Sequence, residues 1–119
     1  MHGLAVELAP FEIAQTAGED QLLAASRRLE ADFLANADGY LGRLLLKQDE
    51  HRYLDLVLWR SQADADKAVE AAMASEACHA YFACMANTDH QEPGAGVEHY
   101  RVVRAFGQFA ALVAETHAA

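Results

Sequence analysis

The sequence is poor in basic residues, in long apolar runs and in cysteine, and each shortage excludes a class of protein. Its 9 Lys and Arg stand against 18 Asp and Glu, a formal net charge of −9. Nucleic acids and anionic membrane surfaces bind clustered Lys or Arg, so neither is an expected partner. No apolar run approaches the roughly 20 residues of a membrane span. Glu7 and Glu12 interrupt the first apolar stretch, which no basic segment precedes, so we expect no signal peptide and a cytoplasmic protein.

The two cysteines, Cys78 and Cys84, are six residues apart on one predicted helix. Six residues turn a helix by about 600°, so the side chains point to different faces and cannot form a disulfide. Free thiols are typical of a reducing compartment. The 6 histidines show neither HxxxH nor HExxH spacing, and no CxxC is present, so we expect no bound metal.

The composition, 53% hydrophobic and 23% charged, is typical of one globular domain, here residues 1–119. Hydrophobic spacing, turn residues and caps predict the order β-α-β-β-α-β with a split second helical region. This order is the ferredoxin-like α+β fold, an antiparallel sheet with its helices on one side. Pro10 suggests an edge or a bulge in the first strand. The predicted strands are residues 4–14, 40–47, 53–59 and 97–109, with a short alanine-rich tail; the predicted helices are 19–36, 63–74 and 76–86, with a loop over 87–96.

The most informative segment is residues 39–64, where two apolar runs flank a polar turn and Ser61 and Asp64 begin a helix. This pattern predicts a β-hairpin followed by a capped helix. The strand over 53–59 is apolar on both faces, whereas the helices of this fold cover only one. We therefore expect a homodimer packed sheet against sheet. The alternative is a cover made by the C-terminal tail alone.

Asp55 is the only acid inside that apolar strand, on the same side as Tyr53, Val57 and Trp59. A buried carboxylate without a partner has a raised pKa, which suits a general base that takes a proton from a phenol or an enol. The alternative is structural, a salt bridge from Asp55 to an arginine on a neighbouring strand. The arginines available for it are Arg43, Arg101 and Arg104.

Two histidines and several aromatic residues complete the set of candidate site residues. His79 and His99 are candidate acid–base groups, because unperturbed imidazole titrates near neutrality. Trp59 and Tyr40 are candidate walls of a pocket. For every one of these residues the alternative is a place in the core or on the surface. The further candidate ligand-contacting residues are Tyr53, Tyr81 and Phe82.

Four segments together resemble a known family: Gly-Tyr-Leu-Gly at 39–42, Leu-Trp-Arg-Ser at 58–61, the capped helix that follows, and the helix with Ser75, Tyr81 and Phe82. The chain resembles the dimeric α/β-barrel superfamily and, within it, the antibiotic biosynthesis monooxygenase-like domains, over nearly its whole length. The resemblance implies a homodimer with a pocket in each subunit between helices and sheet. Members include cofactor-free oxygenases of polycyclic aromatics, quinol oxygenases, haem-degrading enzymes and many proteins without a known activity.

The sequence departs from the haem-degrading members. They pair the strand-end Trp with a His on the second helix, where this chain has Ala-Val-Glu at 68–70, and their first-strand Asn has no counterpart at 4–13. We therefore expect no haem chemistry of that kind. The first function hypothesis is a cofactor-free monooxygenase of an aromatic or quinol-like molecule, with Asp55 or a His as base. The alternative is a non-catalytic dimer that binds a small hydrophobic ligand or none. No catalytic motif decides between them.

Overall fold

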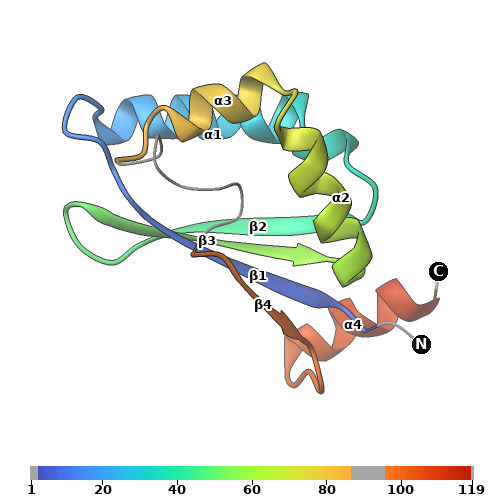
Figure 1. The fold of residues 1–119 in the computed structure, drawn as a ribbon. Helices are drawn as coiled ribbons and strands as arrows, with labels where there is room; N and C mark the ends of the chain where they lie inside the picture. Colours follow the sequence, from blue (N-terminus) through green and yellow to red (C-terminus); the bar gives the residue numbers. More distant parts are fainter. Residues whose placement is uncertain (1–2, 87–95, 119) are drawn as a thin grey trace.

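The computed structural model describes residues 3–86 and 96–118, with side chains up to residue 113 (Figure 1). The predicted order of elements is confirmed as far as the last strand, and the loop predicted over 87–96 lies almost wholly outside the described residues. No helix among the described residues is both long and apolar enough to cross a bilayer. The elements are β1 (Ala5–Glu12), α1 (Glu19–Asp32), a 3₁₀ turn η1 (Leu34–Asn36), β2 (Tyr40–Lys47), β3 (Arg52–Trp59), α2 (Gln62–Ala72), α3 (Glu76–Phe82), β4 (Glu98–Arg101) and α4 (Gln108–Ala118).

The four strands form one antiparallel sheet in the order β2-β3-β1-β4, and α1, α2 and α3 cover one of its faces (Figure 1). This is the predicted ferredoxin-like arrangement. Trp59 at the end of β3 lies opposite both Ala5 of β1 and Tyr40 of β2, which fixes the register of the sheet. β4 pairs with β1 only over Ala5–Leu8, so Pro10 lies where β1 has a strand on one side only, as its missing N–H requires.

Two serine caps begin the helices that follow β3. The Ser61 hydroxyl accepts a hydrogen bond of 3.2 Å from the Asp64 N–H at the start of α2. The Ser75 hydroxyl accepts one of 3.2 Å from the Cys78 N–H at the start of α3. Each cap satisfies one otherwise unpaired N–H and stabilises its helix by about 1 kcal/mol. Both caps were predictable from the sequence alone.

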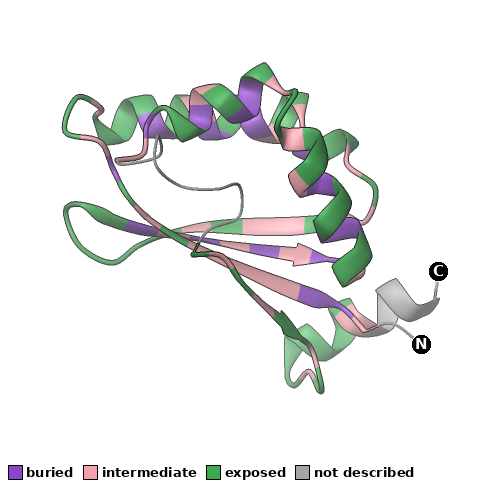
Figure 2. Cartoon of the chain, viewed as in Figure 1, coloured by how far each residue is buried: buried purple, intermediate pink, exposed green. Residues whose placement is uncertain are grey.

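The core lies between the helices and the sheet (Figure 2). From β3, alternate residues face it: Tyr53, Asp55, Val57 and Trp59 are buried, whereas the leucines between them are only partly covered. The predicted two-sided character of this strand is therefore confirmed. We call the side of the sheet away from α1–α3 the open face. The register places on it Val6, Leu8, Leu44, Leu46, Leu54, Leu56, Leu58 and Tyr100.

The prediction for the C-terminal region is wrong. The last strand was expected over 97–109 with a short tail, but β4 ends at Arg101 and residues 108–118 form the helix α4. Gly107 has a φ of +62°, a conformation that ends extended structure, and the alanine-rich segment after it favours a helix. In Figure 1, α4 lies on the side of the sheet away from α1–α3. It leaves the open face largely uncovered, because Leu44 is still 57% exposed.

Candidate active site

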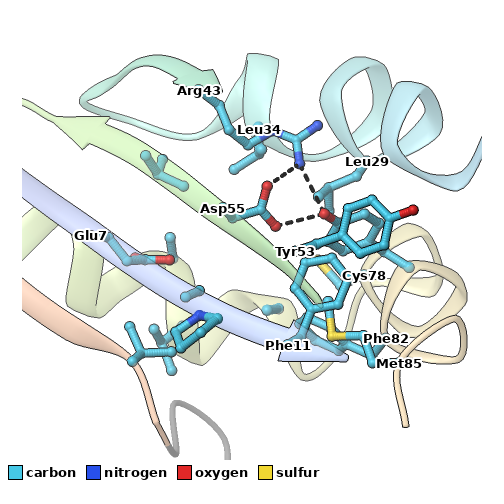
Figure 3. Close-up of a pocket in the computed structure, with 18 of the residues that line it drawn as sticks. Glu7, Phe11, Leu29, Leu34, Arg43, Tyr53, Asp55, Cys78, Phe82 and Met85 are labelled. Carbon is cyan, nitrogen blue, oxygen red and sulfur yellow. Dashed lines mark hydrogen bonds and ion pairs between the residues drawn. The ribbon is translucent and has the colours of Figure 1, made fainter. Parts of the chain in front are cut away.

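A cavity of about 900 Å³ lies between the covering helices and the sheet (Figure 3). Its volume is within the usual range for small-molecule sites. Most of its lining is apolar and aromatic, supplied chiefly by β1, β3, α1–α3 and the residues that follow α3. Among these side chains are Phe11, Leu29, Tyr53, Trp59 and Met85. Two clusters of polar side chains interrupt this lining, one on β3 and one on β1.

The first cluster is centred on Asp55, both of whose carboxylate oxygens are hydrogen-bonded. Arg43 Nη1 lies 3.1 Å from Asp55 Oδ1, and the Tyr81 hydroxyl donates to Asp55 Oδ2 over 2.6 Å. Arg43 Nη2 donates in turn to the Ser26 hydroxyl and to the Ser26 carbonyl at 3.2 Å. We call Arg43, Asp55, Tyr81 and Ser26 the Arg43 network. It joins β2, β3, α3 and α1. Figure 3 shows the Arg43–Asp55 contact at the wall of the cavity.

Burial dominates the electrostatics of this network. It raises the pKa of the Asp55 carboxyl, and the hydrogen bonds from Tyr81 and Arg43 counteract that rise only in part. Burial and the neighbouring Asp55 also raise the pKa of Tyr81, so its phenol stays protonated and donates to the carboxylate. The two readings of Asp55 from the sequence therefore coexist: it lines the cavity with a raised pKa, and it is paired with Arg43.

The second cluster brings together Glu7 of β1, His99 of β4 and Trp59 of β3. Trp59 Nε1 donates to Glu7 Oε1 over 3.2 Å. His99, opposite Glu7 in the β1–β4 register, places its Nε2 3.4 Å from the same oxygen. That contact lacks hydrogen-bond geometry, and the buried Nε2 has no hydrogen-bond partner among the described residues. Burial raises the pKa of Glu7; His99 and Trp59 counteract the rise, and the charge of Asp55 adds to it.

Sequence reasoning missed Glu7. Along β1, Glu7 sits between Val6 and Leu8, which is the pattern of a polar residue on a solvent-facing side. Only the register shows otherwise: Ala5 lies opposite Trp59, so Glu7 lies on the Trp59 side of the sheet. Figure 3 shows its carboxylate on β1, facing the cavity and apart from the Arg43–Asp55 pair.

The remaining candidates are only partly brought together. His79 lines the cavity but is exposed, and its Nε2 lies 2.8 Å from the Met73 carbonyl. Tyr40 is not part of the lining: its hydroxyl donates to Glu30 over 2.7 Å and its ring packs edge-on against Trp59. The predicted site residues that do line the cavity are Tyr53, Asp55, Trp59, His79, Tyr81, Phe82 and His99.

Neither a metal site nor a disulfide is found in the part of the chain that the structure describes. No group of three or more His, Cys, Asp or Glu side chains there could hold a metal ion. Cys78 and Cys84 are both buried and free. Burial raises the pKa of both thiols, so they behave as small apolar side chains.

No protein-family model matches the chain, and no curated protein does. Solved structures do match it. A candidate antibiotic biosynthesis monooxygenase from Bordetella bronchiseptica is 21% identical, with a TM-score of 0.67 over 86% of this chain and 99% of that one. Another from Caulobacter crescentus is 22% identical, with a TM-score of 0.61 over 87% and 92%. SnoaB, a cofactor-independent oxygenase from Streptomyces nogalater, is 14% identical, with a TM-score of 0.59 over 88% and 96%.

These likenesses define the class of fold. The chain has the ferredoxin-like α+β fold of the antibiotic biosynthesis monooxygenase-domain proteins, as the sequence resemblance implied. At such identities the match concerns the fold alone, and the chemistry has to be argued from the cavity.

Proposed function

We propose that this protein is a cofactor-free oxygenase that oxidises an electron-rich aromatic or quinol-like molecule with O₂. The observation that carries the proposal is the cavity itself, which has a volume of about 900 Å³ and a mostly apolar and aromatic lining. Glu7, Asp55 and His99 are among the ionisable groups of that lining. Such a cavity suits a flat apolar ligand that must lose a proton before it reacts. The structural likeness to SnoaB, a cofactor-independent oxygenase, supports the same reading.

The chemistry needs a base and a dry site but no prosthetic group. A naphthalene diol that loses a hydroxyl proton to the protein becomes a naphtholate, which can transfer an electron to O₂. Recombination forms a C–O bond at the ring carbon para to that oxygen. Loss of the proton from that carbon and cleavage of the O–O bond then give a hydroxynaphthoquinone and water. The organic molecule gains one oxygen atom and loses two hydrogen atoms. One atom of O₂ enters the quinone, and the other leaves in water.

Within this scheme the described side chains divide into walls and proton carriers. Trp59, Tyr53 and Phe82 offer flat surfaces against which an aromatic ring can stack. Asp55 and the Glu7–His99 pair are the proposed groups that handle the ligand proton. Each Asp55 oxygen already accepts one hydrogen bond, so a ligand would share that oxygen with Arg43 or Tyr81, whereas His99 Nε2 has no hydrogen bond to break.

We also propose that the working unit is a homodimer joined through the open face. On this face Leu44 is 57% exposed and Tyr100 50% exposed, and beyond β4 the side chains of Phe106 and Phe109 are more than 70% exposed. So large an apolar surface is uncommon on a monomer. A second copy, sheet against sheet, would cover it.

A binding module without catalysis is the second candidate. The observation that favours it is the Arg43 network, in which both oxygens of Asp55 are already hydrogen-bonded, so that this carboxylate resembles a structural ion pair more than a free base. In that case the cavity holds an aromatic ligand without changing it.

Oxygen uptake in the presence of a chelator separates the two candidates. We expect the protein to consume O₂ with a naphthalene diol faster than the uncatalysed solution does and to yield a hydroxynaphthoquinone. His99→Ala should reduce the rate about 10²–10⁴-fold, the usual effect of losing a group that takes part in general acid–base catalysis. His51→Ala, in the exposed hairpin turn, is the matched control and should leave the rate unchanged. Uptake equal to the blank, with tight binding of the diol, would favour the binding module.

A further inference from the structure

The least satisfied polar group in the described structure is His99 Nε2, and it lies in the cavity. It is buried, it has no hydrogen-bond partner among the described residues, and it is 3.4 Å from Glu7 Oε1 in poor geometry. Buried polar atoms are nearly always paired, so an unpaired one at a cavity wall calls for an external partner.

Glu7 also has unused hydrogen-bonding capacity. A carboxylate can accept about four hydrogen bonds, and among the described residues Glu7 accepts one with good geometry, from Trp59 Nε1. A ligand group that lies beside Glu7 and His99 and bridges them must therefore donate to the carboxylate and accept from the imidazole N–H. A hydroxyl does both at once. An anionic carboxylate does not, because it would meet the charge of Glu7, with Asp55 also on the same face of the sheet.

The surroundings of this pair define the rest of the ligand. Trp59 of β3 brings its indole to Glu7, and the α2 residues that line the cavity are Ala68, Val69 and Ala72, all small. Among other charged groups, His99 of β4 and Asp55 of β3 have the largest effects on the pKa of Glu7: His99 lowers it and Asp55 raises it. The room between small helical side chains and an indole is apolar and suits an aromatic ring.

We propose that Glu7 and His99 form a subsite for a phenolic hydroxyl. The ligand O–H donates to a Glu7 oxygen, and the ligand oxygen accepts from His99 Nε2–H. This inference rests on the proposed function, since it names the substrate class of the same cavity as neutral phenols and adds Glu7 to its binding residues. In the oxidation, the ligand proton passes to Glu7 and the phenolate oxygen stays bound to the His99 N–H.

Binding in the absence of O₂ tests the subsite without any turnover. Calorimetry would compare a naphthol with its methyl ether, which keeps the ring and the oxygen but cannot donate. A hydrogen bond to a charged acceptor predicts that the naphthol binds about tenfold to a hundredfold more tightly. Naphthoic acid should bind more weakly than the naphthol, because its carboxylate meets Glu7. Equal affinities for naphthol and ether, or no binding of either, would overturn the proposal.

Variants then assign the preference to the two side chains. Glu7→Leu should abolish the preference for naphthol over ether, and Glu7→Gln, which keeps the size and an acceptor oxygen, should reduce it. Glu12→Gln is the matched control and should leave the preference unchanged. Glu12 is an exposed carboxylate at the other end of β1, and its pairing with Arg52 places it on the other side of the sheet from Glu7. His99→Ala should weaken naphthol binding, whereas His99→Gln, whose amide can donate from nearly the same position, should restore it. A full preference in folded Glu7→Leu would contradict the subsite.

The outcomes also separate this inference from the proposed oxidation. A naphthol preference that depends on Glu7, without O₂ uptake above the blank, keeps the subsite and rejects the oxygenase. O₂ uptake without any naphthol preference keeps the oxygenase and rejects the subsite.

Discussion

Arg43 and Asp55 form a buried ion pair across the β2–β3 hairpin, with Nη1 3.1 Å from Oδ1 and both side chains 8% exposed. Tyr81 holds the second carboxylate oxygen, so the pair joins the hairpin to α3. A charged side chain this well buried needs an oppositely charged partner, because burial removes the water that would otherwise solvate it. The same contact therefore forms a wall of the cavity and holds sheet and helices together.

Asp55→Asn should destabilise the protein strongly. It leaves Arg43 as a buried charge without its counter-ion, and breaking a buried pair in this way costs about 3–5 kcal/mol. From the sequence alone, the same substitution is expected to stop the reaction and leave the fold intact. Urea unfolding of the parent protein and of Asp55→Asn measures the change in the free energy of unfolding. Asp66→Asn, on the exposed side of α2, is the control and should change stability by less than about 0.5 kcal/mol. Equal effects of the two substitutions would show that the Arg43 network is not structural.

Light scattering after gel filtration should give about twice the 13.0 kDa of one chain. Leu56→Asp, on the open face, should disrupt the dimer and lower stability by about 3 kcal/mol or more, since it buries an unpaired charge. Leu23→Asp is the matched control, because Leu23 is a 39% exposed leucine on α1, away from the open face. It should leave the dimer intact. If the parent protein is a monomer at micromolar concentration, the proposal that the open face forms a dimer interface is wrong.

Asp64 should contribute a pH-dependent stability that Asn cannot replace. Its carboxylate accepts from Arg60 Nε at 2.9 Å and from the Ser61 hydroxyl at 2.9 Å, and these bonds hold the pKa of Asp64 below its ordinary value of 3.8. A lowered pKa stabilises the fold above pH 3.8, and this contribution is lost as the pH falls through the folded-state pKa.

The parent should thus be more stable than Asp64→Asn by about 1–2 kcal/mol at neutral pH. The gap should close as the pH falls below 3.8. Urea unfolding of both proteins over a series of pH values measures it. A gap that stays constant down to the acid limit of folding would mean that the charge of Asp64 does not contribute.

Haem should not be degraded by this protein. The α2 residues that line the cavity are Ala68, Val69 and Ala72, and none of them can ligate iron. Titration with haemin, followed at the Soret band, should show no tight stoichiometric complex. Such a complex, followed by loss of the band when a reductant is added in air, would contradict the expectation.

The sequence was sufficient to predict most of the fold because its signals were local. Alternation in β3 placed Asp55 with Tyr53 and Trp59, and Ser61 and Ser75 marked the helix starts. These features depend on residues that are close in the chain. The hairpin and the helix order followed from the same kind of pattern.

The site was less predictable because it depends on contacts between distant segments. Glu7 faces the cavity only because Ala5 pairs with Trp59, and a shift of the β1–β3 register by one residue would place it on the open face. The pairing of Glu7 with His99 likewise needed the position of β4. In the C-terminal region, the apolar run after Arg101 has the composition of a strand. The chain instead turns at Gly107, which has a positive φ, and continues as the helix α4.

The central claim is that the cavity adds an oxygen atom from O₂ to an aromatic ring without a cofactor. Mass spectrometry of the product of a single turnover tests this claim, with a naphthalene diol as substrate, isotopically heavy O₂ and a chelator present. The reaction is quenched at once, because quinone oxygens exchange with water. The account predicts one heavy oxygen atom in the hydroxynaphthoquinone, the other in water, and no hydrogen peroxide. An unlabelled product with hydrogen peroxide as the fate of O₂, or no product beyond that of the protein-free solution, would contradict it.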